Sequence, residues 1–200
     1  MILRTKVRYL RKFKCVLPSF TRKQVNKRKN KPGEHPFFSS KKTSVKNSFI
    51  ERLHRKQKLK LMFCISEKQL KNYIKFSLIY TKNNPFWGLY NVLHSRLDYI
   101  IYKLHFAKTI LQARQLVNHG HFFINGVKQK TPSYSCKVGD LISTKSDLAL
   151  NNIKSYLIGR VYFNELKFVD FDKFIISVQK PKFINLEILN LVKSTFEFYI

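Results

Sequence analysis

Positive charge is concentrated in the first 60 residues, which hold 20 Lys and Arg side chains against two acidic ones. Such a segment repels itself, and residues 1–33 show no sustained apolar period that could offset the repulsion. Basic runs on ordinary solvated faces usually mix both signs of charge, and this one does not. We therefore expect the segment to be extended alone and to bind a polyanion.

The whole chain keeps the same bias but can still build a core. Its 200 residues carry a net charge of +28, and 44% of them are apolar. Nucleic acid is the first candidate partner, and an anionic membrane surface is the alternative. No apolar run approaches the ~18 residues that span a bilayer. Residues 1–33 also lack a basic amphipathic helix.

Residue usage bears on the origin of the gene. Lys, Phe, Ile, Asn and Tyr, which have A/T-rich codons, make up 88 of the 200 residues. This bias is typical of organelle genomes, although an A+T-rich nuclear or bacterial genome would give it too. An organelle-encoded chain needs no import signal, so we expect the mature protein to begin near Met1. Cys15, Cys64 and Cys136 lack metal-ligand spacing, and we expect neither a metal nor a cofactor.

Two stretches have clear local patterns. Apolar residues at three- and four-residue offsets predict helix over 49–80, ended by Asn83-Asn84-Pro85. Residues 95–143 predict a helix capped by Ser95 and then a second helix. The second helix begins with a capping box of Thr109 and Gln112.

The second helix is followed by turn signals. Gly120 suits a left-handed residue after the helix, and Asn125-Gly126 predicts a type I′ hairpin before a strand at 141–143. Within this helix we expect Ala113 to face inward. Arg114, rotated by about 100°, should face a partner.

Several motifs resemble the RNA-binding domain named after the fourth small-subunit ribosomal protein. They are Ser95-Arg96-Leu97-Asp98, Ala113-Arg114-Gln115-Leu116-Val117, His119-Gly120-His121, Asn125-Gly126, Pro132-Ser133-Tyr134 and Val138-Gly139-Asp140-Leu141-Ile142. The same module occurs in pseudouridine synthases, a bacterial tyrosyl-tRNA synthetase and small stress proteins, so by itself it implies only RNA binding.

The flanks resemble the ribosomal protein itself. Residues 55–60 and 63–70 are similar to the stretch that precedes the module there, although the family usually has Tyr-Gly in place of Phe63-Cys64. Pro32-Gly33-Glu34-His35 resembles a family turn, and residues 195–200 resemble its C-terminal strand. The likeness is poor over 1–30 and 146–180, which favours a fast-evolving mitochondrial copy.

The resemblance implies an α+β fold. We expect a mostly helical N-terminal region and a module of two helices packed on an antiparallel sheet. The predicted divisions are a basic rRNA-binding arm at 1–48, a helical region at 49–94 onto which 181–200 packs back, the RNA-binding module at 95–145, and a strand-rich extension at 146–200 with strands around 156–178.

The resemblance also implies a structural role in the small ribosomal subunit of an organelle. We expect a mitochondrial location, with the plastid as the alternative. The expected partners are the 5′ domain of small-subunit rRNA, where assembly would be nucleated, and neighbouring small-subunit proteins near the mRNA path. No membrane or small-molecule substrate is expected, and the chain shows no acid–base, nucleophile or phosphate-loop motif of an enzyme. A free-standing RNA-binding stress or regulatory protein, or a fragment of an RNA-modifying enzyme, remain the alternatives.

Candidate RNA contacts are the basic residues of the arm, the helical region and the module. Arg96 has alternatives as an ion-pair partner of Asp98 or as a helix cap. Arg114 has one as a member of a local ion pair, with Asp98 as a candidate partner, and His119 and His121 have one as ordinary turn residues. The predicted RNA-binding residues are Arg22, Lys23, Lys27, Arg28, Lys29, Lys31, Arg55, Lys56, Lys58, Arg96, Lys103, Lys108, Arg114, His119, His121, Lys128 and Lys130.

Deleting residues 1–33 should weaken rRNA binding and flatten its salt dependence, because each lost phosphate contact removes about 0.9 from the log–log slope on duplex RNA or DNA. The measurement is fragment binding at several salt concentrations. An unchanged slope after the deletion would show that the arm does not contact RNA.

Overall fold

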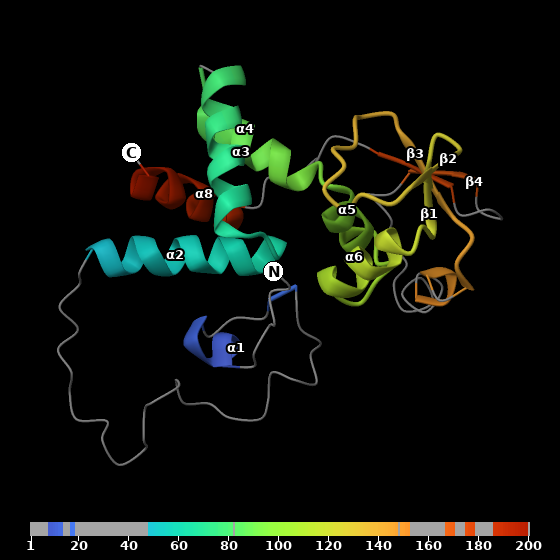
Figure 1. Ribbon diagram of the computed structural model, residues 1–200, viewed down its shortest axis with the longest axis horizontal. Helices are drawn as coiled ribbons and strands as arrows, with labels where there is room; N and C mark the ends of the chain where they lie inside the picture. The colour runs from blue at the N-terminus through green and yellow to red at the C-terminus, as the bar shows by residue number, and fades with distance from the viewer. Residues whose placement is uncertain are drawn as a thin grey trace, which may run out of the picture. The chain divides into compact units, whose positions relative to one another are not determined.

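The computed structural model describes residues 8–13, 17–18, 48–81, 83–147, 149–152, 167–170, 175–178 and 186–199. The fold is α+β, as predicted. The chain divides into two compact units, one formed by 1–90 with 185–200 and the other by 91–184 (Figure 1). The four divisions predicted from the sequence stay predictions, and most of the expected basic arm lies outside the described residues.

The described part of the first unit is helical. Its elements are α1 (Arg8–Phe13), α2 (Ser48–Phe63), α3 (Glu67–Tyr80), the first part of α4 (Pro85–His94), and α8 (Leu186–Tyr199).

The helical stretch predicted over 49–80 is broken into α2 and α3. Cys64 adopts a left-handed backbone with φ of 50°, the conformation that glycine tolerates best. Ser66 then caps α3, because its Oγ accepts a hydrogen bond from the Gln69 amide while the Gln69 side chain accepts one from the Ser66 amide. The break therefore has a local cause in the residues between the helices.

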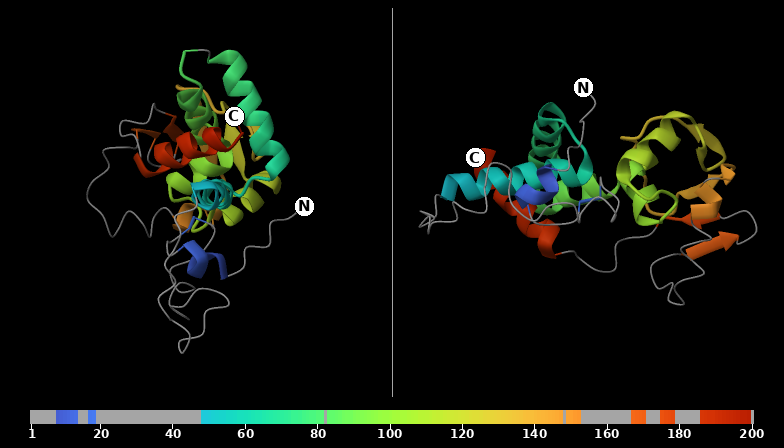
Figure 2. Two further views of the ribbon diagram at one scale, coloured as in Figure 1. Left: turned by 90° about the vertical axis from the view of Figure 1, so that its left-hand side faces the viewer. Right: turned by 90° about the horizontal axis from the view of Figure 1, so that it is seen from below.

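The C-terminal segment is a helix and packs against α2 (Figures 1 and 2). The strand expected at 195–200 is thus wrong over 195–199. Ile188, Leu191, Val192, Thr195 and Phe196 are buried, and their spacing of three and four residues is helical. The contact includes the rings of Phe49 and Phe198, whose centroids are 5.5 Å apart.

Glu67 is the electrostatic centre of this unit and joins three helices. It accepts hydrogen bonds from Lys56 (3.1 Å) and Lys60 (2.7 Å) of α2 and from the hydroxyl of Tyr199 on α8. Burial alone would raise the pKa of Glu67. The hydrogen bonds from Lys60, Tyr199 and Lys56 outweigh it and lower the pKa from 4.5 to about 2.

The second unit packs two helices on a five-stranded sheet (Figures 1 and 2). Every neighbouring pair of strands is antiparallel, and the strand order is β2-β1-β3-β5-β4. The elements are α5 (Leu97–Lys103), α6 (Ile110–Asn118), β1 (Phe122–Ile124), β2 (Val127–Gln129), β3 (Leu141–Thr144), β4 (Lys167–Asp170) and β5 (Ile175–Ser177).

Several local predictions for this unit are confirmed. Asn125 and Gly126 both have positive φ, of 50° and 82°, and join β1 to β2 as the type I′ signal requires. Ala113 is fully buried in the core between α5, α6 and the sheet. Strands expected around 156–178 are found as β4 and β5, and residues 153–166 lie outside the described part.

None of the described helices could span a membrane. Each of them is too short or too polar to cross a bilayer.

Replacing Glu67 by Gln should flatten the acid side of the stability profile. The folded-state pKa of about 2 lies below the usual 4.5, so the carboxylate stabilises the fold above pH 4.5. That contribution is lost as the pH falls toward 2. We expect the melting temperature of the wild type to fall more steeply over this range than that of Glu67→Gln.

Glu197→Gln removes an exposed carboxylate of α8 and serves as the matched control. Parallel melting curves of wild type and Glu67→Gln between pH 4.5 and 2 would contradict the assignment.

Candidate nucleic-acid interface

The N-terminus of α5 is closed by the loop that follows the hairpin. Main-chain carbonyls of Tyr134 and Pro132 accept hydrogen bonds from the amides of Leu97 (2.9 Å) and Asp98 (3.1 Å). Arg96, not Ser95 as predicted, is the N-cap residue of α5, and its side chain makes no capping bond. These first amides therefore bond to the protein's own carbonyls and are not offered to a phosphate.

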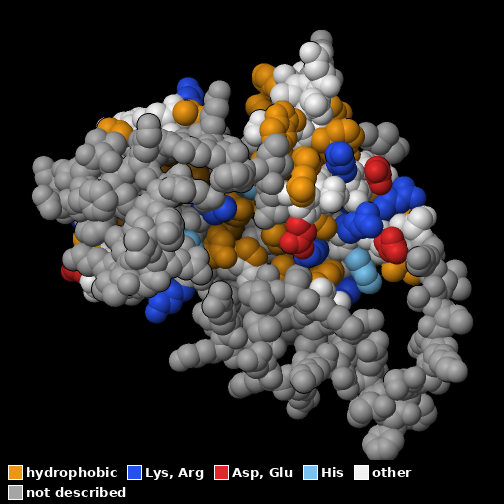
Figure 3. Space-filling model, turned by 180° about the vertical axis from the view of Figure 1, so that it is seen from behind, with side chains coloured by type: hydrophobic (Ala, Val, Ile, Leu, Met, Phe, Trp, Pro, Cys, Tyr) orange, Lys and Arg blue, Asp and Glu red, His pale blue; other side chains and the backbone are white. Residues whose placement is uncertain are grey.

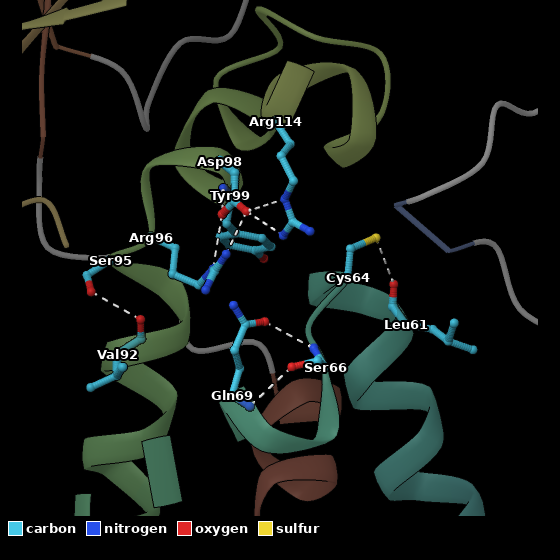
Figure 4. Close-up of polar contacts among 10 residues, drawn as sticks. All are labelled: Leu61, Cys64, Ser66, Gln69, Val92, Ser95, Arg96, Asp98, Tyr99 and Arg114. Carbon is cyan, nitrogen blue, oxygen red and sulfur yellow. Dashed lines mark hydrogen bonds and ion pairs between the residues drawn. The ribbon is translucent and has the colours of Figure 1, made fainter. Parts of the chain in front are cut away.

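The hydroxyl of Ser95 has other partners, which explains why it does not cap the helix. It donates to the carbonyl of Val92 (3.1 Å, Figure 4) and lies 2.8 Å from the Ser135 hydroxyl. Beside it, Arg96 and Ser135 form an isolated antiparallel bridge.

Asp98 is fully buried and binds two arginines (Figure 4). Arg96 donates to it through Nε (3.1 Å) and Nη2 (2.7 Å), and Arg114 of α6 through Nε (3.2 Å) and Nη2 (2.7 Å). The Tyr99 amide donates to the same carboxylate at 2.8 Å. The two arginines predicted as RNA contacts thus link α5 to α6 through one carboxylate.

The exposure of the two arginines differs. The Arg96 side chain is 3% exposed and the Arg114 side chain 26% exposed. Arg96 therefore offers almost no surface to a partner. This agrees with the alternative considered from the sequence, in which Arg96 is an ion-pair partner of Asp98. Arg114 was expected on the polar face of the helix, and it keeps a partly exposed edge there.

The ends of α6 follow the sequence prediction in part. Thr109 caps the helix by accepting a hydrogen bond from the Gln112 amide, at 3.2 Å. The Gln112 side chain accepts its bond from the Lys108 amide, one residue before the cap, so the predicted capping box is only half formed. Gly120 has φ of 73° at the C-terminal end. A Cβ there would lie 2.2 Å from Cε of Lys128, so the far end of this side chain passes over Gly120.

Exposed basic residues lie at both ends of α6 and on the hairpin. Lys108 precedes the helix, His119 ends it, and Lys128 and Lys130 belong to the hairpin and the loop after it. Lys103 at the end of α5 is exposed, and His121 is half-buried. In the described part of the chain, no carboxylate pairs with Lys108, Lys128 or Lys130. These cations face outward without internal neutralisation.

The three candidates on α2 are bound to other parts of the first unit. Arg55 lies 3.7 Å from Glu51 and donates to the Ser194 hydroxyl at 2.9 Å. Lys56 is buried between Glu67 and the Phe198 ring, 3.8 Å from the ring centroid. Lys58 pairs with Glu187. The remaining candidates, Arg22, Lys23, Lys27, Arg28, Lys29 and Lys31, lie outside the described residues.

Two exposed lysines of the second unit were not among the predicted contacts. Lys137 and Lys145 are both exposed, and the Lys145 amine lies 5.5 Å from the centroid of the Phe123 ring. Their positions in the sequence could have indicated them, because Lys137 lies in the turn before strand β3 and Lys145 directly follows it.

Metal and thiol chemistry find no support among the described residues. No group of three or more metal-ligating side chains occurs there. Burial, with smaller contributions from Asp140 and Asp98, raises the pKa of Cys136 to about 12 and keeps the thiol protonated.

Asp98→Asn should destabilise the fold by about 3–5 kcal/mol, because it leaves two arginines without their counter-charge. Arg114→Ala should cost less, about 1–3 kcal/mol, since the Arg96–Asp98 pair survives. The measurement is urea unfolding of the full chain.

Asp147→Asn is the control, because it removes an exposed carboxylate and should change stability by no more than about 0.5 kcal/mol. An unfolding midpoint for Asp98→Asn equal to that of Asp147→Asn would show that the buried pair does not hold the helices together.

Comparison with known proteins places this geometry in a family. Residues 95–142 match the S4 domain. A protein from Prototheca wickerhamii, "Small ribosomal subunit protein uS4c", is 40% identical over 144 residues, which cover 70% of this chain and 68% of the relative. One of the same name from Emiliania huxleyi is 37% identical over 158 residues (78% and 75%). "Small ribosomal subunit protein uS4" of Synechococcus sp. (strain JA-3-3Ab) is 41% identical over 130 residues (65% and 61%).

The similarity reaches well beyond the S4 domain, since the matched lengths of 130–158 residues greatly exceed 95–142. A shared RNA-binding module alone would not extend so far. Family membership agrees with the prediction of a structural ribosomal role without enzyme activity. The chain therefore belongs to the uS4 family of small ribosomal subunit proteins.

Proposed function

We propose that this protein binds the 5′ domain of small-subunit rRNA in the ribosome of a plastid and nucleates assembly there. The observation that carries the proposal is the set of exposed lysines around α6 and the hairpin, Lys108, Lys128 and Lys130, which pair with no carboxylate among the residues that the structure describes. RNA helices are bound largely through phosphate and 2′-hydroxyl contacts, and unneutralised lysines suit such a surface.

The contacts divide by their surroundings. Lys108, Lys128 and Lys130, with His119, form the direct RNA surface on the second unit. Arg96 acts through Asp98 and keeps α5 in place, because its side chain is buried. On α2, Arg55, Lys56 and Lys58 stabilise the first unit. Residues 22–31 add phosphate contacts, as expected from the concentration of positive charge in the first 60 residues of the sequence.

The compartment is proposed as a plastid in preference to the mitochondrion first expected. The relatives from Prototheca, Emiliania, Cyanophora and Guillardia carry the name uS4c, which is used for plastid copies. None of these names supports a mitochondrion. Contact with neighbouring small-subunit proteins near the mRNA path remains part of the proposal, by resemblance.

Replacing Lys108, Lys128 and Lys130 together by Ala should lower affinity for a 5′-domain rRNA fragment and reduce the log–log salt slope by roughly 2–3. Stability should stay within about 0.5 kcal/mol per substitution, because the three lysines are exposed and make no described ion pair. The measurement is binding at several salt concentrations, beside melting of the same samples.

Lys193→Ala removes one exposed lysine of α8 and is the control, because it shows how much the loss of a single surface charge elsewhere changes RNA binding. A triple variant that binds the fragment with the wild-type slope would overturn the proposed surface. Equal binding to 5′-domain and 3′-domain fragments would overturn the proposed rRNA site.

A further inference from the structure

The last turns of α3 expose a group of large apolar side chains. Phe76 is 47% exposed, Ile79 65% and Tyr80 70%, and Leu78 is 43% exposed beside them. Figure 3 shows hydrophobic side chains gathered over α3 and α4 on this side of the molecule. We name Phe76, Ile79 and Tyr80 the α3 apolar face.

This face lies away from the core of its own unit. Leu70 and Ile74 are the large apolar residues that α3 buries, whereas Ile79, nine residues after Leu70, lies on the opposite side at 100° per residue. Burying Ile79 inside the unit would turn Leu70 outward, whereas Phe76 and Tyr80 lie on the flank between these two sides of the helix. The apolar face is therefore available to something outside the described part of the chain.

The two aromatic rings are already ordered against each other. The centroids of Phe76 and Tyr80 are 4.2 Å apart, and their planes are inclined by only 29°. Residues four apart on a helix meet in this way, so the rings form a preformed flat surface. Little side-chain freedom is lost when a partner covers it.

Two lysines continue the same side of the helix toward its N-terminus. Lys68 and Lys75 are seven residues apart and exposed, and Ile79 follows four residues after Lys75. Glu67, the one acidic residue of α3, is already bound by Lys56, Lys60 and Tyr199. Among the described residues no carboxylate pairs with Lys68 or Lys75.

We propose that the α3 apolar face docks a neighbouring protein of the small subunit through an apolar patch bordered by Asp or Glu side chains. RNA satisfies this surface only in part: a base can stack on the open face of Phe76 or Tyr80, but it leaves Ile79, which is 65% exposed, without an apolar partner. A protein patch would bury Ile79, Phe76 and Tyr80, while acidic residues at its border would neutralise Lys68 and Lys75. The inference rests on the proposed ribosomal function.

The test places a photoactivatable cross-linking amino acid at position 79 in the full-length protein. The protein is assembled into small subunits, which are purified, irradiated and analysed by mass spectrometry. We expect an adduct with a ribosomal protein, at an apolar segment next to Asp or Glu. The same probe at Asn190, an exposed position of α8, is the control. Combining the probe with Lys68→Glu and Lys75→Glu should lower the adduct yield by about tenfold, because like charges would then face each other.

The outcomes separate the two proposals. Failure of the wild-type chain to enter small subunits would overturn the ribosomal function and this inference with it. Normal entry with an adduct to rRNA, or with no adduct, would overturn the docking face alone. A protein adduct that is equally strong from position 190, or unchanged by the two charge reversals, would also overturn it.

Discussion

In each unit of this protein, a carboxylate of the described part takes hydrogen bonds from two cations and joins two helices. Asp98 binds Arg96 and Arg114 and joins α5 to α6, and Glu67 binds Lys56 and Lys60 and joins α3 to α2. With 11 acidic residues against 39 basic ones, internal neutralisation is scarce in this chain. In both places it joins two helices that follow one another in the chain, where an unpaired buried charge would oppose folding.

This scarcity separates the buried cations from the exposed ones that are proposed to bind RNA. Arg96 and Lys56 are buried with a carboxylate, whereas Lys108 and Lys128 are exposed and pair with no carboxylate in the described part of the chain. Folding therefore leaves a large positive charge on the surface, where it is relieved by a polyanion. Residue type alone cannot make the distinction, since a guanidinium and an ammonium serve both purposes.

Local features could be predicted from the sequence, and features that depend on distant partners could not. The Thr109 cap, the left-handed Gly120 and the Asn125-Gly126 turn are set by residues within four positions of each other, and all three are found. Arg114 was expected to be a surface contact because it lies off the apolar stripe of its helix, with a local ion pair as the alternative. The local pattern could not decide between the two, because Asp98 is 16 residues away on another helix. The C-terminal helix was expected to be a strand by resemblance, although its buried residues repeat every three and four positions. Contacts to rRNA remain predictions, because they depend on a partner outside the chain.

The hydrogen bond between Ser95 and Cys136 bears on how a module of this kind can be inserted into other proteins. The Cys136 amide donates to the Ser95 carbonyl at 2.8 Å, so the chain enters and leaves the helix–helix–hairpin segment at nearly the same point. A segment whose two ends are adjacent can be inserted into another protein without stretching the host's backbone. The geometry thus gives a physical reason why a module resembling this one recurs in proteins as different as synthases, a synthetase and stress proteins.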